Sequence, residues 1–535
     1  MINQNKKKIV VLTITLLIAA GFCLFIKNID SDLDNISEEK DALSAAESNS
    51  CMPGLNVSSD VSFLEEKTEL IPDTNKGIYY NGVLLPYDAD SNTLYLAQTI
   101  NDDLWHGTLT AEIIGECSIY TISCDNWLQK KESIANNYVF TIWLTNDKAY
   151  YEYNLCVTGT PVIWIQNITK DIITMTLFDP DTGTITESRT EFRQKGSSSF
   201  YSSKKSYALD LINDAGAENY MSLLGMREGS SWKLNSLYQD PLRIREITAA
   251  ELWKEIDEAN SNIDEPGPVM RYVELLIDDG YDGLCTLVEP MDAEKLKLTD
   301  GDALHKIIVN DHWLANDEIM DCILDKKSIS SAAEIKFPDT ITDYGAAWTP
   351  MLDYNSWVYG EEITYEEAVK KVNLENLYDY NVFIMTTNAL DNYRNNVYLA
   401  SRADDTGNNV AYFYLWDLDR TFGVKSDSLY DTILLDALTR LMELNPGEVK
   451  KAFANRYFAY RDNILSNENI IGLLEKNCDY LTNTGAITRE AIRYPEGSYE
   501  NGTISTDLTE VIKFQTERMD WLDEFFSDML SEAAE

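Results

Sequence analysis

Basic residues are scarce in this sequence. Its 535 residues include 44 lysines and arginines against 89 aspartates and glutamates, which gives a formal net charge of −45. A surface of this sign repels nucleic acid and anionic lipid, so neither is expected as a partner. Any site for an anionic ligand must therefore be built locally, from a few basic residues or a metal ion.

Cysteine is also scarce, and its spacing excludes two classes of small domain. None of the eight cysteines forms a Cys-x-x-Cys pair, so a zinc site is not indicated. Seven of them follow the N-terminal apolar segment at scattered positions, and this odd number does not form a disulfide framework. The spacing leaves room for one bridge, Cys117 to Cys124, and buried single thiols are expected elsewhere.

The N-terminus carries the clearest targeting signal. Three lysines at residues 6–8 precede an apolar run at residues 9–26, which is near the length that spans a bilayer. We therefore expect residues 1–27 to form a single-pass anchor in the cell membrane, with the bulk of the chain extracytoplasmic. A cleaved signal peptide is the main alternative, although the cleavage pattern is poor, and Phe22 disfavours a lipoprotein site at Cys23.

Length and composition predict several globular domains after this anchor. The acidic, Ser-rich residues 28–55 are expected to be a disordered tether. Residues 56–158 carry short strand-like runs between polar turns, which predicts a small all-β module of sandwich type. Residues 159–535 contain strands first and helices later, an α+β order typical of a two-lobed domain whose lobes meet near residue 300.

A polar segment before a strand gives the strongest indication of chemistry. In NALDNYRNNVYLA, Asp391 stands five residues before Asn396, where an apolar run begins. A turn and a second apolar run lead to Asp417 and Asp419 in WDLDRTFG. Because a hairpin places its open ends side by side, Asn396 and Asp417 are expected within a few ångströms of one another.

This set of oxygen ligands is typical of a phosphoryl-transfer site. There the first Asp orients the attacking hydroxyl, while an Asn and a second Asp hold a metal ion against the nucleotide phosphates. Hard oxygen ligands suit Mg²⁺ or Mn²⁺ rather than zinc. Asp and Asn are also common caps of helices and turns, and this alternative stays open.

A second segment gathers the few basic residues. FRQKGSSSFYSSKKSYALDL, residues 192–211, places four basic side chains around a Gly-Ser-Ser-Ser turn. Backbone and hydroxyl groups at Gly196 and Ser198 can approach phosphate oxygens, and a lysine on the next strand can add a charge. The segment matches neither a P-loop nor a GxGxxG pattern, so a solvated Ser-rich hairpin is the alternative.

Together these segments resemble the CotH kinase family, named for a spore coat protein H and related to the protein kinases. The matching segments are, in order, KGSSSF, KKSYALDL, YQDPLRIREITAAELW, YVELLIDDGYDGLCTLVEP, DNYRNNVYLA and WDLDRTFG. The resemblance extends from about residue 161 to about residue 526, and the last two segments are the most specific. Two departures stand out: the family's Arg-Gly-Asn is Lys-Gly-Ser at residues 195–197, and the His-Arg-Asp triplet of ordinary kinases is absent.

The resemblance implies a two-lobed protein-kinase-like fold and roles for the nucleotide-binding residues. Lys204, with Lys205 as a less favoured alternative, would pair with the phosphates of ATP. Gly196 and Ser198 would lie in the turn that covers these phosphates. Glu289 would lie near the link between the lobes, where adenine sits in kinases.

The resemblance also implies the catalytic and metal-binding residues. Asp391 would be the base-like residue. Asn396 matches the metal-binding Asn by its five-residue offset, with Asn395 as the alternative. Asp417, with Asp419 beside it, would complete the Mg²⁺ or Mn²⁺ site.

The function implied is that of an atypical, membrane-anchored, extracytoplasmic kinase. It would transfer the γ-phosphoryl group of ATP to Ser, Thr or Tyr hydroxyls of a protein substrate, or of itself. The alternative is a non-catalytic surface or adhesion protein, which would bind a cell-wall polymer or a coat-like assembly through its β module. A glycan-processing enzyme would have the paired acids but no second supporting feature. The intact Asp391, Asn396 and Asp417 favour the kinase.

Overall fold

The computed structural model describes most of the chain after residue 50. The described residues are 51–112, 116–196, 202–260, 263, 265–307, 328–329, 333–360, 362–403, 408–423, 428–495 and 507–533. Pro53–Glu535 form one compact unit of mixed α+β structure. Within the described ranges, none of the helices has both the length and the apolar character that a membrane crossing needs. The anchor predicted at residues 1–27 lies outside these ranges.

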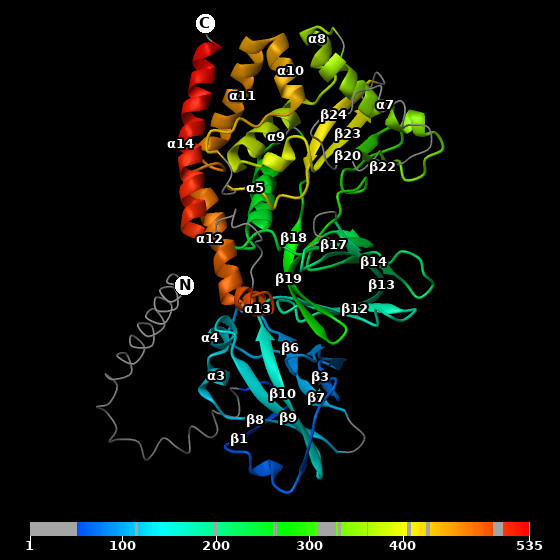
Figure 1. The fold of residues 1–535 in the computed structure, drawn as a ribbon, viewed down its shortest axis with the longest axis vertical. Coiled ribbons are helices and arrows are strands. Elements are labelled where there is room, and N and C mark those ends of the chain that lie inside the picture. Colours follow the sequence, from blue (N-terminus) through cyan, green and yellow to red (C-terminus); the bar gives the residue numbers. More distant parts are fainter. Residues whose placement is uncertain are drawn as a thin grey trace, which may run out of the picture. The chain divides into compact units, whose positions relative to one another are not determined.

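The first part of the unit is rich in short strands, as the sequence predicts (Figure 1). Its larger sheet has the order β1-β8-β9-β10-β6-β5, with β2 paired to β10, and a smaller sheet has the order β4-β3-β7. Two short helices, α3 and α4, interrupt the strands and were not predicted. The elements are β1 (Leu55–Ser58), η1 (Ser62–Leu64), β2 (Thr68–Leu70), β3 (Ile78–Tyr80), β4 (Val83–Leu84), β5 (Tyr87–Asp88), β6 (Thr93–Ala97), β7 (Leu109–Ala111), β8 (Ser118–Ile122), α3 (Asp125–Leu128), α4 (Lys130–Ala135), β9 (Val139–Thr145) and β10 (Ala149–Thr158). Cys117 and Cys124 are free thiols, so the bridge considered between them is not formed.

The second part is a closed barrel. Its strand order is β11-β12-β13-β14-β17-β19-β18, and a parallel pairing of β11 with β18 closes the ring. Alternating apolar side chains such as Leu209, Trp232 and Leu275 fill the interior. The strands are β11 (Val162–Gln166), β12 (Ile173–Phe178), β13 (Ile185–Lys195), β14 (Ser206–Ile212), β17 (Ser231–Asn235), β18 (Met270–Ile277) and β19 (Gly280–Val288), and a small ladder pairs β15 (Met221–Ser222) with β16 (Glu228–Gly229). Antiparallel hairpins join β12 to β13 and β18 to β19.

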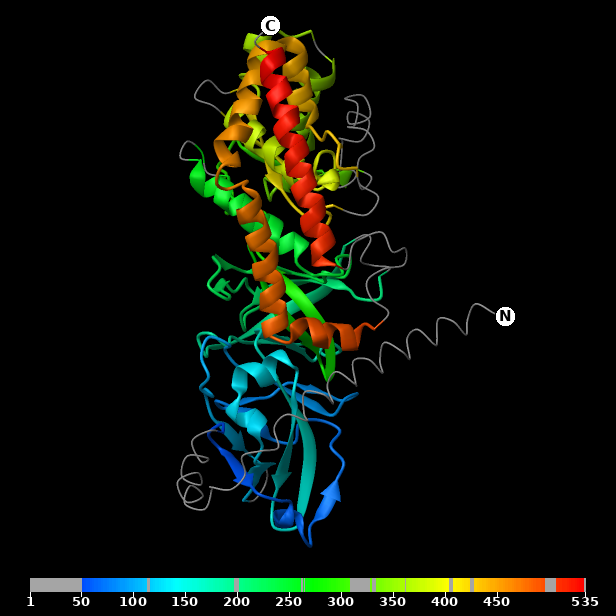
Figure 2. The same cartoon turned by 90° about the vertical axis from the view of Figure 1, so that its left-hand side faces the viewer.

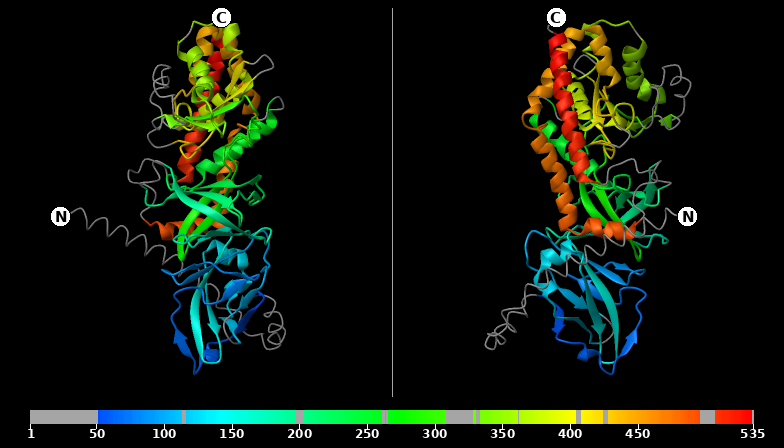
Figure 3. Two further views of the ribbon diagram at one scale, coloured as in Figure 1. Left: turned by 90° about the vertical axis from the view of Figure 1, so that its right-hand side faces the viewer. Right: turned by 60° about the vertical axis from the view of Figure 1, so that its left-hand side comes forward.

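The third part combines a second sheet with most of the helices. The sheet has the order β21-β22-β20-β23-β24. Its strands are β20 (Ala303–Ile307), β21 (Ser328–Ile329), β22 (Ala333–Phe337), β23 (Val397–Ala403) and β24 (Asn409–Leu415). The helices are α5 (Arg245–Ala259), α7 (Tyr344–Asn355), η2 (Ser356–Gly360), α8 (Tyr365–Ala368), α9 (Leu374–Thr387), η3 (Leu390–Asn392), α10 (Asp436–Leu444), α11 (Pro446–Arg461), α12 (Asn467–Asn483), α13 (Ala486–Arg493) and α14 (Leu508–Glu532). Helix α14 packs along α11 and α12 (Figure 2) and extends from the level of the barrel to the far end of the helical part in both views of Figure 3.

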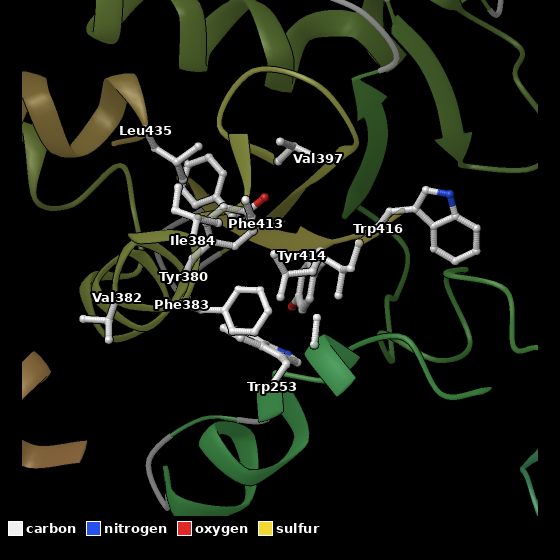
Figure 4. Packing of buried hydrophobic residues seen from close by; sticks show 14 of the residues in the cluster. Trp253, Tyr380, Val382, Phe383, Ile384, Val397, Phe413, Tyr414, Trp416 and Leu435 are labelled. Carbon is white, nitrogen blue, oxygen red and sulfur yellow. The ribbon is translucent and has the colours of Figure 1, made fainter. Parts of the chain in front are cut away.

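An aromatic core holds α5, α9 and the hairpin of β23 and β24 together (Figure 4). The ring of Trp253, on α5, lies edge to face 5.3 Å from the ring of Phe383, on α9. Nearly one turn earlier on α9, the ring of Tyr380 lies 6.0 Å from the ring of Phe413, on β24. Aromatic pairs of this kind add about 0.5–1.5 kcal/mol each to the burial of their surface. The core therefore fixes the start of α5 relative to the open ends of the hairpin.

Candidate functional site

The predicted hairpin is present, and its open ends lie side by side. Val397 is the register partner of Leu415, so Asn396 and Trp416 stand next to one another where the two strands end. The buried amide of Asn392 ties these ends together, because its Nδ2 donates to the carbonyl oxygen of Trp416 at 2.7 Å and of Asn396 at 3.5 Å.

Asn396 and Asp417 share an uncommon backbone conformation. Their φ angles are 53° and 60°, in the left-handed region that non-glycine residues rarely adopt and that Asn and Asp tolerate best. Such conformations cost about 1–3 kcal/mol each and are found preferentially at functional sites. The residue types at these two positions therefore suit the turns by which the chain enters and leaves the hairpin.

Asp391 lies close to the same place, on η3. Its carboxylate is 3.6 Å from the guanidinium of Arg420. Burial raises the pKa of Asp391, the Arg420 charge lowers it, and the charge of Asp417 raises it. The side chain remains 28% exposed, so a substrate hydroxyl can reach it. The structure thus brings together Asp391 and Asp417, which the sequence placed on either side of the hairpin.

The neighbouring Asp419 shows how much negative charge gathers here. Burial raises the pKa of its carboxyl group well above the ordinary value. The charges of Asp417, Glu246 and Asp391, in that order, raise this pKa further. Carboxylates that repel one another in this way are relieved by a nearby cation.

Glu246 comes from the first turn of α5 and was not predicted. The helix start is capped by Asp240, whose Oδ2 accepts from the amides of Ile244 at 2.7 Å and Arg245 at 2.8 Å. This cap directs Glu246 toward the hairpin, where burial and then the charge of Asp417 raise its pKa, while Lys195 lowers it. In the sequence, the Asp-containing segment YQDPLRIRE indicates the start of a helix. Nothing in that segment indicates that Glu246 faces the site.

Two lysines approach the site from opposite elements. Lys195, at the end of β13, hydrogen-bonds Asn235 Oδ1, and the Asn235 amide donates to Glu246 Oε1 at 2.7 Å. The ammonium group of Lys195 lies 5.9 Å from the ring centroid of Trp416. Lys306, on β20, lies 5.6 Å from the same ring. The charge of Asp417 raises the pKa of both lysines against the lowering effect of burial.

Lys204 is engaged elsewhere, on the α13 side of the barrel. Its fully buried ammonium lies 2.8 Å from both carboxylate oxygens of Glu490 and also donates to the carbonyl oxygen of Leu284. Arg243 contacts the same carboxylate at 3.1 Å. Lys205, the alternative, donates to the carbonyl oxygen of Ser202 at 2.6 Å. The structure therefore does not bring Lys204 to the hairpin ends.

The other predicted nucleotide-binding residues are Gly196, Ser198 and Glu289. Gly196 directly follows Lys195 and has a φ of 92°, which a side chain would disfavour. Ser198 lies outside the described residues. Glu289 directly follows β19, and its carboxylate is held by Lys295 at 2.6 Å and by the amide of Arg227 at 2.9 Å.

The donor set suits a hard cation that also binds substrate. Among the described residues, no three His, Cys, Asp or Glu side chains form a group that could hold a metal ion by themselves. Mg²⁺ commonly uses one or two carboxylates, water and substrate phosphates rather than a complete protein cage. Asp417 and Asp419, with an amide oxygen at Asn396, fit this pattern.

Comparison with known proteins identifies the family to which the chain belongs. A family model described as CotH kinase protein matches residues 192–522, which is more than half of the chain. The comparison with curated proteins finds no match. The matched range begins near the end of β13 and ends in α14, so it includes four of the seven barrel strands in full, β14, β17, β18 and β19, and the hairpin of β23 and β24.

Proposed function

The chain belongs to the CotH kinase family, and from this premise we propose that it transfers the γ-phosphoryl group of ATP to a protein hydroxyl. The acceptor would be a Ser, Thr or Tyr side chain of another protein or of the chain itself. The observation that carries the proposal is the meeting of Asp391, Asp417 and Lys195 at the open ends of one hairpin. In this reading the barrel and the helical part are the two lobes of a kinase-like domain.

Each group at the hairpin has a distinct task in the proposed reaction. Asp391 orients the acceptor hydroxyl and takes its proton as the phosphoryl group moves. Asp417 and Asp419, with Asn396, would hold Mg²⁺ or Mn²⁺. When bound, that ion would neutralise charge on the nucleotide phosphates.

We assign the phosphate-binding lysine to Lys195 rather than Lys204. Lys195 is held through Asn235 by Glu246 of α5, so its position depends on the helix that packs against the hairpin. Lys204 already has Glu490 as a buried partner. Moving the fully buried Lys204 to a nucleotide would break its ion pair with Glu490, which is costly.

The proposed location is outside the cytoplasm. The three lysines at residues 6–8 and the apolar run at residues 9–26 support an anchor with a cytoplasmic N-terminus. A chain of net charge −45 repels ATP at long range, so the metal ion and Lys195 must offset that repulsion close to the site.

The test is label transfer from γ-labelled ATP. The full-length chain is incubated with Mg²⁺ or Mn²⁺ and compared with Asp391→Ala, Asp417→Ala and the exposed control Asp528→Ala. We expect the first two variants to lose about 10²-fold or more of the transfer rate and the control to retain it. Absence of transfer in the wild type would overturn the proposed activity, whereas equal transfer by either site variant would overturn the assignment of that residue.

A further inference from the structure

Four lysines from two parts of the fold lie near one another, and two of them contact the ring of Trp416. Lys195 and Lys233 belong to the barrel strands β13 and β17, whereas Lys306 and Lys336 belong to β20 and β22 of the second sheet. All four residues are half-buried. In a chain with twice as many acidic as basic residues, such a gathering needs a physical reason.

The lysines form an inner and an outer pair. The ammonium groups of Lys195 and Lys306 lie 5.9 Å and 5.6 Å from the Trp416 ring, and both feel the charge of Asp417. Lys306 also lies 5.8 Å from the ring of Tyr398. The outer pair is Lys233 and Lys336. Burial and then the charges of Arg193 and Lys336 lower the pKa of Lys233, while Lys336 itself pairs with Glu334 at 2.8 Å.

Two of these lysines lack an acidic partner at close range. Among the described residues, no carboxylate lies within ion-pair distance of the ammonium of Lys306 or Lys233. Lys233 donates to Ser231 Oγ at 3.3 Å, while nearby Asp210 is bound by Arg193. Lys306 contacts aromatic rings.

Like charges held together from two elements favour an anion between them. Burial lowers the pKa of Lys306 and of Lys233, and the charges of neighbouring lysines lower both further. A ligand with several negative groups in a row would relieve this repulsion on both sides at once. A phosphate chain has this chemistry, and it would begin beside Asp417, where the inner pair lies.

We propose that Lys306 and Lys233 are binding residues of a phosphate clamp in which the barrel and the second sheet hold the phosphate chain of a nucleoside triphosphate from opposite sides. This inference rests on the proposed function for the identity of the nucleotide, but the clamp itself requires only a chain of phosphate groups. The clamp makes affinity depend on the number of phosphates more than on the nucleoside.

The test compares ligands that differ in phosphate number. The affinities of the full-length protein for MgATP, AMP and inorganic tripolyphosphate are measured by calorimetry for the wild type, Lys306→Gln, Lys233→Gln and the exposed control Lys254→Gln. For either clamp variant we expect about tenfold weaker binding of MgATP and tripolyphosphate, and less than about threefold change for AMP. The control should bind all three ligands as the wild type does, and melting without ligand confirms that each variant is folded.

The outcomes separate the clamp from the proposed reaction. If the wild type transfers label and both clamp variants bind MgATP as tightly as the wild type, the clamp is wrong and the kinase assignment stands. If no label is transferred but tripolyphosphate binds and weakens in both variants, the clamp stands and the reaction is wrong. Failure of the wild type to bind either MgATP or tripolyphosphate would overturn the clamp.

Discussion

The barrel carries two very different groups of charged residues, one against α13 and one against the hairpin ends. Against α13, Arg489 Nε lies 2.8 Å from Glu274, and Lys204 lies 2.8 Å from Glu490. These four side chains are at most 3% exposed. Against the hairpin ends, several carboxylates lie close to one another and near two lysines, and most of these residues are half-buried.

The pKa shifts show the same contrast. Burial tends to raise the pKa of Glu274, but Arg489 outweighs it and holds that pKa below its ordinary value. At the hairpin, burial and like charges act in the same direction and raise the pKa of Asp419. Buried charges that satisfy one another are costly to separate and hold the chain together, whereas like charges left partly open are typical of sites that bind a ligand.

The largest expected effect is on stability, at Glu490. Glu490→Ala would leave Lys204 and Arg243 buried without their shared carboxylate, so we expect a loss of about 3–5 kcal/mol in the free energy of unfolding. Chemical denaturation measures it, with the exposed Glu475→Ala as the control. A loss below about 1 kcal/mol would show that the α13 group does not hold the barrel.

The next prediction sets Lys195 directly against Lys204. Lys195→Gln should reduce label transfer about 10²-fold and change the free energy of unfolding little, because its side chain is half-buried. Lys204→Gln should show the reverse, with lower stability and nearly normal transfer by the folded fraction. Transfer rates and denaturation curves of both variants provide the measurement. If Lys204→Gln loses transfer and Lys195→Gln loses stability instead, Lys204 is the phosphate-binding lysine.

A smaller effect is expected at Asn392, which joins the two hairpin ends. Asn392→Ala leaves the carbonyl oxygen of Trp416 without its 2.7 Å donor, so we expect a loss of about 1–3 kcal/mol in stability. Because Asn396 and Asp417 would no longer be held together, the metal concentration needed for half-maximal transfer should rise. A metal titration of the transfer rate tests this, and an unchanged midpoint in a destabilised variant would limit Asn392 to a structural role.

The hairpin was predictable from the sequence because its contacts are local. Two apolar runs joined by a turn determine which residues meet, and Val397 and Leu415 do pair as that pattern requires. The helix at Arg245–Ala259 and the final helix at Leu508–Glu532 are likewise indicated by local sequence patterns. In each case the information lies within about 30 residues of sequence.

The choice between the two lysines was not predictable, because it depends on distant contacts. Lys204 meets Glu490, 286 residues further along the chain, only because α13 returns to the barrel. Nor does local sequence reveal that β11 pairs with β18 or that Glu246, in the first turn of α5, turns toward Asp417. The anchor predicted at residues 1–27 lies outside the described residues and stays a prediction.

A third group of charged residues does not follow the contrast between the two sides of the barrel. The smallest predicted effect concerns this group. Glu265 and Asp379 are like charges, yet both are fully buried, near Asn260 and Arg456. Burial raises the pKa of both carboxyl groups, and the charge of Asp379 raises that of Glu265 further. The folded protein therefore favours at least one proton on this pair.

The sign of the resulting pH dependence follows from these raised pKa values. Below the ordinary Glu pKa of about 4.3 both folded and unfolded chains hold the proton, and the stabilisation is fully present. As the pH rises through the raised folded pKa values, the stabilisation is lost, and we expect about 1–2 kcal/mol less stability at pH 9 than at pH 6. Glu265→Gln keeps the shape of the side chain but removes its titratable carboxyl group. Its denaturation midpoint should therefore fall less between pH 6 and pH 9. The midpoint of the control Glu475→Gln should change with pH as that of the wild type does. If stability falls equally with pH in all three proteins, Glu265 and Asp379 are buried without a shared proton. The spacing of like charges would then not by itself distinguish a ligand site from a structural one.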